Sequence, residues 1–164
     1  MDRQLIKRLG FLVNHIYRFI KALVISNLAE KGIDLTYEQS GLIIAMWHHE
    51  GSNQQGIADH LLKEKSSTLR LLDSLEEKGI VRREKDPHDR RNKLIFLTDS
   101  GKEILDKLLE LNDENIQKIF FGLDNSNLEE LEKIMGMMYN NIKPEHSTNY
   151  ESINFMRLYN ECIS

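Results

Sequence analysis

Two short segments of the chain gather arginine and hydroxyl side chains, the groups that proteins place against phosphates and base edges. In the first segment, 65–75, leucines form one side of a helical pattern and the other side carries Ser66, Ser67, Arg70 and Ser74. Short hydroxyls at a helix start let the backbone approach phosphates. An arginine one turn later can donate two hydrogen bonds to a guanine, worth about 1–3 kcal/mol of discrimination. An ordinary capped surface helix with a solvated arginine fits the same pattern, so this segment alone leaves both interpretations open.

The second segment is Asp89-Arg90-Arg91, which follows the turn-forming pair Asp86-Pro87 and lies between two β-rich stretches. A guanidinium on a rigid hairpin suits the narrow, electronegative minor groove of A·T-rich DNA. We expect Asp89 to pair with an arginine and fix the loop rather than to contact DNA. A solvated charge run is the alternative, and the elements that precede the hairpin argue against it.

The formal net charge of −4 counts against DNA binding, because DNA-binding proteins usually carry a basic bias. The charge is unevenly distributed, however. Residues 63–93 contain ten Lys and Arg and seven Asp and Glu, a net charge of +3, which leaves −7 on the rest of the 164-residue chain. This asymmetry is expected if one surface meets phosphate while the rest repels it.

Apolar spacing and capping residues predict the elements that hold these segments. Thr36, with Gln39 three residues later, forms a capping box for a helix that ends near 47. Asn53 caps a short helix over 54–62, and a further helix over 65–78 stops at Gly79. Stretches 80–84 and 93–97 are β-rich and flank a charged loop, which predicts an antiparallel hairpin. Helices followed by a hairpin in this order indicate a winged helix-turn-helix.

Long helices are predicted on both sides of this block, so the expected fold class is mainly α (α+β), a winged helix-turn-helix with long flanking helices. One helix covers about 3–30, one capped by Thr98 or Ser100 runs to about 121, and one covers about 128–142. Their apolar stripes are wider than the central block can cover, which favours a second copy of the chain as partner.

The predicted organisation has three parts. Residues 1–34 and 100–142 form a helical dimerisation region, and residues 35–99 form a DNA-binding domain. Residues 143–164 are a C-terminal tail, in which Pro144 ends a helix and a short amphipathic helix follows Ser152.

Other chemistries lack the residues they need. Cys162 is the single cysteine and is interpreted as an incidental thiol, and no two of the six histidines stand four apart on one helix, so we expect no metal site. No Gly-rich phosphate loop, nucleophile elbow or paired-carboxylate motif occurs, so we expect neither an enzyme nor a cofactor. No run of about 18 apolar residues and no signal-peptide pattern is found, which predicts a cytoplasmic protein.

Three stretches of the chain resemble the MarR (multiple antibiotic resistance regulator) family. They are 71–81 (LLDSLEEKGIV), 86–91 (DPHDRR) and 97–101 (LTDSG), and the Asp-x-Arg hairpin motif followed by Leu-Thr and Gly is the specific part. The resemblance implies an obligate homodimer whose first and last helices interlock. It also implies binding to a palindromic DNA operator, usually as a repressor released by a small ligand.

Position by position, the resemblance implies roles for individual residues. Arg91 matches the family's minor-groove arginine, Asp89 its wing-stabilising aspartate, and Arg70 the arginine common on its recognition helix. His88 stands where the family frequently has arginine, which predicts weaker contacts with the DNA backbone at that position.

The resemblance also implies a cavity for phenolic or aromatic effectors between the dimerisation and DNA-binding parts. His15 on the first helix and Trp47 on the second are the candidate residues beside it. Packing of both side chains in the core, with one polar contact, is the alternative.

The expected function is that of a sequence-specific DNA-binding transcriptional regulator, a ligand-responsive repressor that binds a palindromic operator as a dimer. The alternative is a winged-helix protein-interaction module without DNA binding. Such a module has no need of a basic hairpin tip beside a hydroxyl-rich helix start. DNA is therefore favoured by the polar set Ser66, Ser67, Arg70, Asp89 and Arg91.

Overall fold

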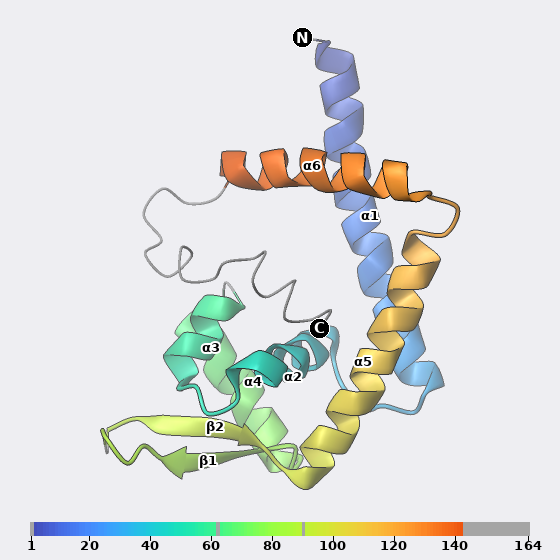
Figure 1. Ribbon diagram of the computed structural model, residues 1–164. Coiled ribbons are helices and arrows are strands. Elements are labelled where there is room, and N and C mark those ends of the chain that lie inside the picture. The colour runs from blue at the N-terminus through green and yellow to red at the C-terminus, as the bar shows by residue number, and fades with distance from the viewer. Residues whose placement is uncertain (1, 62, 90, 143–164) are drawn as a thin grey trace.

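The computed structural model describes residues 2–61, 63–89 and 91–142, apart from the side chain of His48 (Figure 1). The predicted helix after Ser152, Cys162 and the rest of the tail lie outside the described residues. The elements are α1 (Arg3–Glu30), α2 (Tyr37–His49), α3 (Gln54–His60), α4 (Lys65–Glu77), β1 (Val81–Lys85), β2 (Lys93–Leu97), α5 (Asp99–Ile119) and α6 (Asn125–Ile142). Helices with one two-stranded antiparallel sheet confirm the predicted fold class.

The capping residues expected for α2 and α3 begin these helices in the structure. The Thr36 hydroxyl accepts a hydrogen bond from the Gln39 amide at 3.1 Å, and the Gln39 side chain accepts one from the Thr36 amide at 2.9 Å. The Asn53 side chain accepts a hydrogen bond from the amide of Gly56 at 3.0 Å. Each contact pairs an amide that a helix start leaves without a partner, so both predictions are confirmed.

Thr98, rather than Ser100, is the N-cap of α5 and joins this helix to the start of the hairpin. Its hydroxyl accepts from the Gly101 amide at 3.0 Å and donates to the Gly79 carbonyl at 2.6 Å. Gly101 itself packs against the main chain, because a Cβ there would lie 2.1 Å from the Ile80 carbonyl oxygen. A side chain at position 101 would therefore separate α5 from the hairpin.

Two element boundaries differ from the sequence prediction. The first strand begins at Val81, because the Ile80 amide still donates to the Leu75 carbonyl at the end of α4, at 2.9 Å. Helix α6 begins three residues earlier than expected. Asp124 and Asn127 cap its start reciprocally, with the Asn127 amide donating to the Asp124 carboxylate at 2.9 Å.

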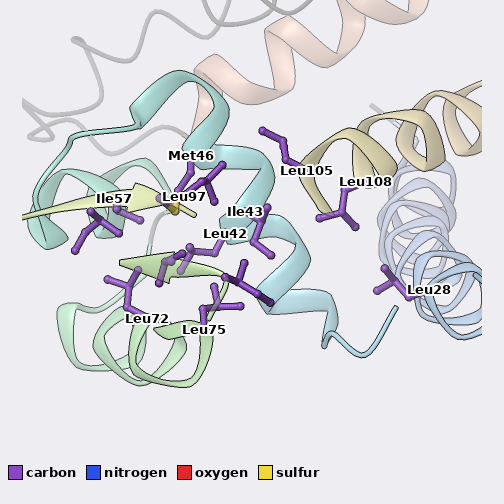
Figure 2. Packing of buried hydrophobic residues seen from close by; sticks show 13 residues of the cluster. Leu28, Leu42, Ile43, Met46, Ile57, Leu72, Leu75, Leu97, Leu105 and Leu108 are labelled. Carbon is purple, nitrogen blue, oxygen red and sulfur yellow. The ribbon is translucent and has the colours of Figure 1, made fainter. Parts of the chain in front are cut away.

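One hydrophobic core joins the central block to the flanking helices (Figure 2). Its buried members are Leu28 from α1, Leu42, Ile43 and Met46 from α2, Ile57 from α3, Leu72 and Leu75 from α4, Ile80, Val81, Ile95 and Leu97 at the hairpin, and Leu105 and Leu108 from α5. Full burial of such a side chain contributes about 1.5–3 kcal/mol. The core therefore fixes α4 and the hairpin relative to each other and to α5.

Two polar contacts tie α1 to the rest of the fold. Lys21 Nζ lies 2.7 Å from Glu38 Oε1 on α2, and a buried hydrogen bond joins the amides of Asn27 and Asn115 on α5. The hydrogen bond with Lys21 lowers the pKa of Glu38, and the same bond raises the pKa of Lys21. Burial raises the pKa of Tyr37, whose ring centroid lies 5.0 Å from Lys21 Nζ. The C-terminal half of α1 is thus anchored on α2 and α5.

The N-terminal half of α1 extends beyond the central block, at the end of the molecule away from the hairpin (Figure 1). Large apolar side chains are exposed along it and just beyond it, with Phe11 at 63% and Phe19 at 71%. Within the described part of the chain, α1 is the one helix long and apolar enough to cross a membrane. That is weak evidence for a span, since helices of soluble proteins pass the same test.

We expect Gly101→Ala to lower the free energy of unfolding by about 2–3 kcal/mol, because the added methyl group meets the Ile80 carbonyl and the main chain has to move. Urea unfolding at one fixed protein concentration measures the change. Gly41→Ala is the matched control, since nothing lies within 4 Å of a Cβ built there, and alanine in a helix interior gains about 0.5–1 kcal/mol over glycine. Equal stability of the two variants would contradict the close packing at Gly101.

Candidate nucleic-acid interface

Helices α3 and α4 form a helix-turn-helix whose second helix is buried on one side only. Thr68, Leu72 and Leu75 of α4 each have 0% of their surface exposed. The Gln54 side chain at the start of α3 donates to the Lys65 carbonyl at 3.0 Å, which joins the starts of the two helices. The opposite side of α4 is therefore held outward in a fixed orientation.

Three of the four residues predicted on α4 share its exposed side. Ser66, Ser67 and Arg70 are exposed, and no described residue forms an ion pair with Arg70. Glu64, the N-cap, makes no side-chain cap hydrogen bond. The first turn of α4 thus offers hydroxyls, amide N–H groups and a guanidinium, which are all donors suited to phosphates and base edges.

The fourth residue, Ser74, lies apart from this set. Its side chain is half-buried, and its hydroxyl accepts a hydrogen bond from the Gln39 side chain of α2 at 3.0 Å. Ser74 thus serves the packing of α4 on α2 in the structure, and its contact with DNA stays a prediction.

The hairpin is held to the core by the part of its inner face away from the tip. Its antiparallel register pairs Val81 with Leu97 and Lys85 with Lys93, and Leu94 forms a further bridge with Asn53 before α3. The inner-face side chains Val81, Ile95 and Leu97 are buried. Since strands tied to a core on one face resist bending, the charged tip is presented from a rigid base.

Two aspartates hold the hairpin tip by hydrogen bonds to the main chain. The Asp86 carboxylate accepts from the His88 amide at 2.8 Å, and the Asp89 carboxylate accepts from the Arg91 amide at 3.0 Å and from the Asn92 side chain at 3.2 Å. We expected Asp89 to pair with an arginine side chain, but none of its described contacts is of that kind. Asp89 orders the loop through the backbone of Arg91, and its pairing with Arg90, which lies outside the described residues, stays a prediction.

Only one of the two arginines at the tip is among the described residues. Arg91 is exposed, and its guanidinium forms no ion pair with any described residue. Arg90 lies outside the described residues, so its predicted contact stays a prediction. His88 is exposed beside them.

Arg83 of β1 was not singled out by the sequence. With 13% of its side chain exposed, it donates from Nη2 to Asp73 Oδ1 at 2.7 Å and from Nη1 to Glu76, both on α4. Strand alternation could have indicated this, because Arg83 is two residues after the buried Val81 and so shares its inner face. Asp73 and Glu76 are three apart, which places them together on one face of the helix.

The two residues predicted beside an effector cavity are not brought together by any described contact. The His15 ring stacks on Phe11 at 3.8 Å between centroids, and its Nδ1 lies 3.2 Å from the Phe11 carbonyl oxygen. Trp47 is 43% exposed. Two hollows of about 550 and 220 Å³ are described, and their lining includes neither residue. An effector site at His15 and Trp47 therefore stays a prediction.

Histidines come together at one place in the described part of the chain. The rings of His49 on α2 and His60 on α3 lie 4.2 Å apart between centroids. No group of three or more His, Cys, Asp or Glu able to hold a metal ion is found among the described residues. The two rings therefore form a packing contact between α2 and α3.

The central block also matches a family model and known regulators in sequence. The model of the MarR family matches residues 35–93, which run from just before α2 to the first residue of β2. The transcriptional regulator HosA of Escherichia coli O111:H- is 30% identical over 89 residues, which are 54% of this chain. The aligned segment spans 65% of the length of HosA.

Solved structures extend the similarity to most of the chain. MepR of S. aureus, solved as a complex with DNA, is 26% identical with a TM-score of 0.75, over 82% of this chain and 97% of that one. CouR from Rhodococcus jostii RHA1, solved with p-coumaroyl-CoA, is 28% identical with a TM-score of 0.70, over 84% of this chain and 95% of that one. The sequence motifs, the winged-helix architecture and these relatives agree, and residues 35–93 of the chain carry the sequence of a MarR family domain.

Proposed function

We propose that this protein is a sequence-specific DNA-binding transcriptional regulator that docks α4 in the major groove and the hairpin wing beside it. The observation that carries the proposal is the pair of exposed arginines, Arg70 on α4 and Arg91 on the wing. Each projects from a rigid element, and neither is engaged by a described acidic residue. Unpaired guanidinium groups on fixed supports are what base and phosphate recognition requires.

Each residue of the proposed interface has a distinct role. Ser66 and Ser67 bind phosphate at the start of α4, and Arg70 reads a guanine edge in the major groove. Arg91 enters the minor groove, and Asp89 orders the wing tip from which it projects. Arg90, outside the described residues, completes the basic tip. MepR, which has a similar fold and was solved as a complex with DNA, supports DNA as the ligand.

A ligand-responsive repressor is the form of regulation that we propose. CouR binds p-coumaroyl-CoA in its solved structure, which supports a small aromatic effector for this chain as well. His15 and Trp47 remain the candidate residues for that effector. The proposed location is the cytoplasm, where such a regulator meets its operator, and the proposed role is regulatory rather than enzymatic, as in the other family members named above.

The regulator is proposed to act as a homodimer on a palindromic operator. Large apolar side chains are exposed on α1 and at the end of α5 and along α6, and no residue of α6 is buried. Monomeric soluble proteins rarely expose apolar patches this extended. The exposed set includes Leu5, Leu9, Phe11, Leu12, Ile16 and Phe19 on α1, and Phe121, Ile134, Met135, Met138 and Ile142 toward the C-terminal side.

The alternative is a winged-helix module that binds a protein and not DNA. The overall charge of −4 is the observation in its favour. The net charge of +3 on residues 63–93, which include both Arg70 and Arg91, argues for DNA instead.

We expect Arg91→Ala to weaken binding to an operator duplex by about tenfold or more, because the wing loses its minor-groove guanidinium. Gel-shift titration measures the affinity, and sedimentation checks that the oligomeric state is unchanged. Lys107→Ala on α5 removes the same charge away from α4 and the wing, and it is expected to bind normally. Wild-type affinity in Arg91→Ala would refute the assignment of the wing.

Arg70→Ala is expected to change base preference as well as affinity, because a bidentate contact to guanine discriminates by about 1–3 kcal/mol. Selection of bound sequences from random DNA by both proteins measures the preference. If both proteins select the same motif and only the affinity falls, Arg70 contacts phosphate and not a base.

The homodimer is tested on the apolar side of α1. Leu9→Glu combined with Phe19→Glu is expected to shift the protein toward monomer in sedimentation at micromolar concentration, since each change places a charge in a face that the partner covers. Asn14→Glu introduces the same charge on the polar side of α1 and should leave the dimer intact. A wild-type protein that sediments as a monomer would contradict the proposal directly.

A further inference from the structure

Arg83 is enclosed between the hairpin and α4. It lies on the inner face of β1, opposite the buried Ile95 in the strand register, and 13% of its side chain is exposed. Its two terminal nitrogens donate separately, Nη2 to Asp73 at 2.7 Å and Nη1 to Glu76. A guanidinium committed to two carboxylates in this way has a fixed orientation and is not itself available to DNA.

Asp73 matters because of its position relative to Arg70. Residues three apart on a helix are neighbours on one face, and both side chains lie on the exposed side of α4. Without Arg83, Arg70 would be the nearest cation along the helix for the Asp73 carboxylate. An ion pair between them would take donors of Arg70 away from a base edge, and a carboxylate left unpaired would repel phosphate.

These ion pairs add little to the stability of the fold. The carboxylates of Asp73 and Glu76 are 49% and 41% exposed, and solvent screens pairs of this kind strongly. The hairpin is already held by the buried Val81, Ile95 and Leu97. The consequence of the contact is therefore electrostatic: both carboxylates on the recognition helix are engaged by one guanidinium, which offsets one of their two negative charges and does not itself compete for DNA.

We propose that Arg83 is a positioning residue for DNA recognition, which holds Asp73 and Glu76 and so leaves Arg70 unpaired on the exposed side of α4. The inference rests on the proposed function, because it assigns Arg83 a part in the same interface. A positioning role differs from a purely structural role in one respect: once the two carboxylates are removed, DNA recognition no longer needs Arg83.

The test compares Arg83→Gln with the triple variant Arg83→Gln, Asp73→Asn, Glu76→Gln. The probe is a duplex selected from random DNA by the wild-type protein, and fluorescence anisotropy measures affinity. Arg83→Gln is expected to bind about tenfold more weakly and to lose base preference at the position that Arg70 reads, since a guanine contact is compromised. The triple variant is expected to regain base preference and to bind within about threefold of wild type.

Arg82→Gln is the matched control. Arg82 is the neighbouring residue on the opposite face of β1, with its guanidinium over the Phe96 ring at 4.9 Å. The Arg82→Gln variant removes the same charge from the same strand as Arg83→Gln. Its affinity for the duplex is expected to stay within about threefold of wild type. Circular dichroism and sedimentation establish that each variant is folded and has the wild-type oligomeric state. Should Arg83→Gln unfold, Arg83→Lys keeps the charge but not the two-carboxylate geometry, and a smaller loss in the same direction is expected.

Two results would overturn the inference. One is wild-type affinity and base preference in Arg83→Gln. The other is a triple variant that stays as weak as Arg83→Gln, because the defect would then come from a displaced wing and not from freed carboxylates. Failure of the wild-type protein to select any sequence would be a different outcome, since it refutes the proposed function itself and the inference with it.

Discussion

Helix α4 has to bury one side and leave the other side free, and it does both within 13 residues. Its buried side supplies Thr68, Leu72 and Leu75 to the core, and its outer side carries Ser66, Ser67 and Arg70. A rotation of the helix by one residue, about 100°, would move an exposed donor inward and an apolar side chain outward. The packing of α4 on α2 and the hairpin therefore decides which side chains face outward in the proposed DNA interface.

The hairpin is bound to α5 as closely as to α4. Thr98 spans the junction by bonding both the Gly79 carbonyl and the Gly101 amide, and Gly101 leaves no space for a side chain against Ile80. Helix α5 also enters the core through Leu105 and Leu108. The first turn of α5 cannot shift relative to the hairpin without breaking these hydrogen bonds. The hairpin and the first turn of α5, which leads to the proposed dimer region, are consequently expected to move together.

Most of the fold could be predicted from local sequence signals, because its elements begin at residues whose side chains cap helices. Thr36, Asn53 and Thr98 each bond the amide that their position predicts. The start of α6 was placed late because Asp124 and Asn127 cap it in a reciprocal arrangement that apolar spacing does not reveal.

The site was harder to predict, since its details depend on contacts between elements. Periodicity placed Ser74 near the outer face of α4, but only the position of α2 shows that its hydroxyl meets Gln39. The role of Arg83 could not be predicted either, because it depends on contacts between β1 and α4. In the sequence Arg83 is one of several basic residues near the hairpin, and its distinctive feature is the pair of acids that α4 places beside it.

The ion pairs explain how a chain with a net charge of −4 can present a basic surface. Of the seven acidic residues in 63–93, Asp73, Glu76 and Glu84 pair with Arg82 or Arg83, and Asp86 and Asp89 accept hydrogen bonds from main-chain amides. Arg70 and Arg91 remain unpaired among the described residues. Five of the seven acids of this segment are thus engaged within the protein, while Arg70 and Arg91 keep their full charge. A count of charges along the sequence gives only a net +3 for the segment, whereas the partner of each charge determines what a phosphate would encounter.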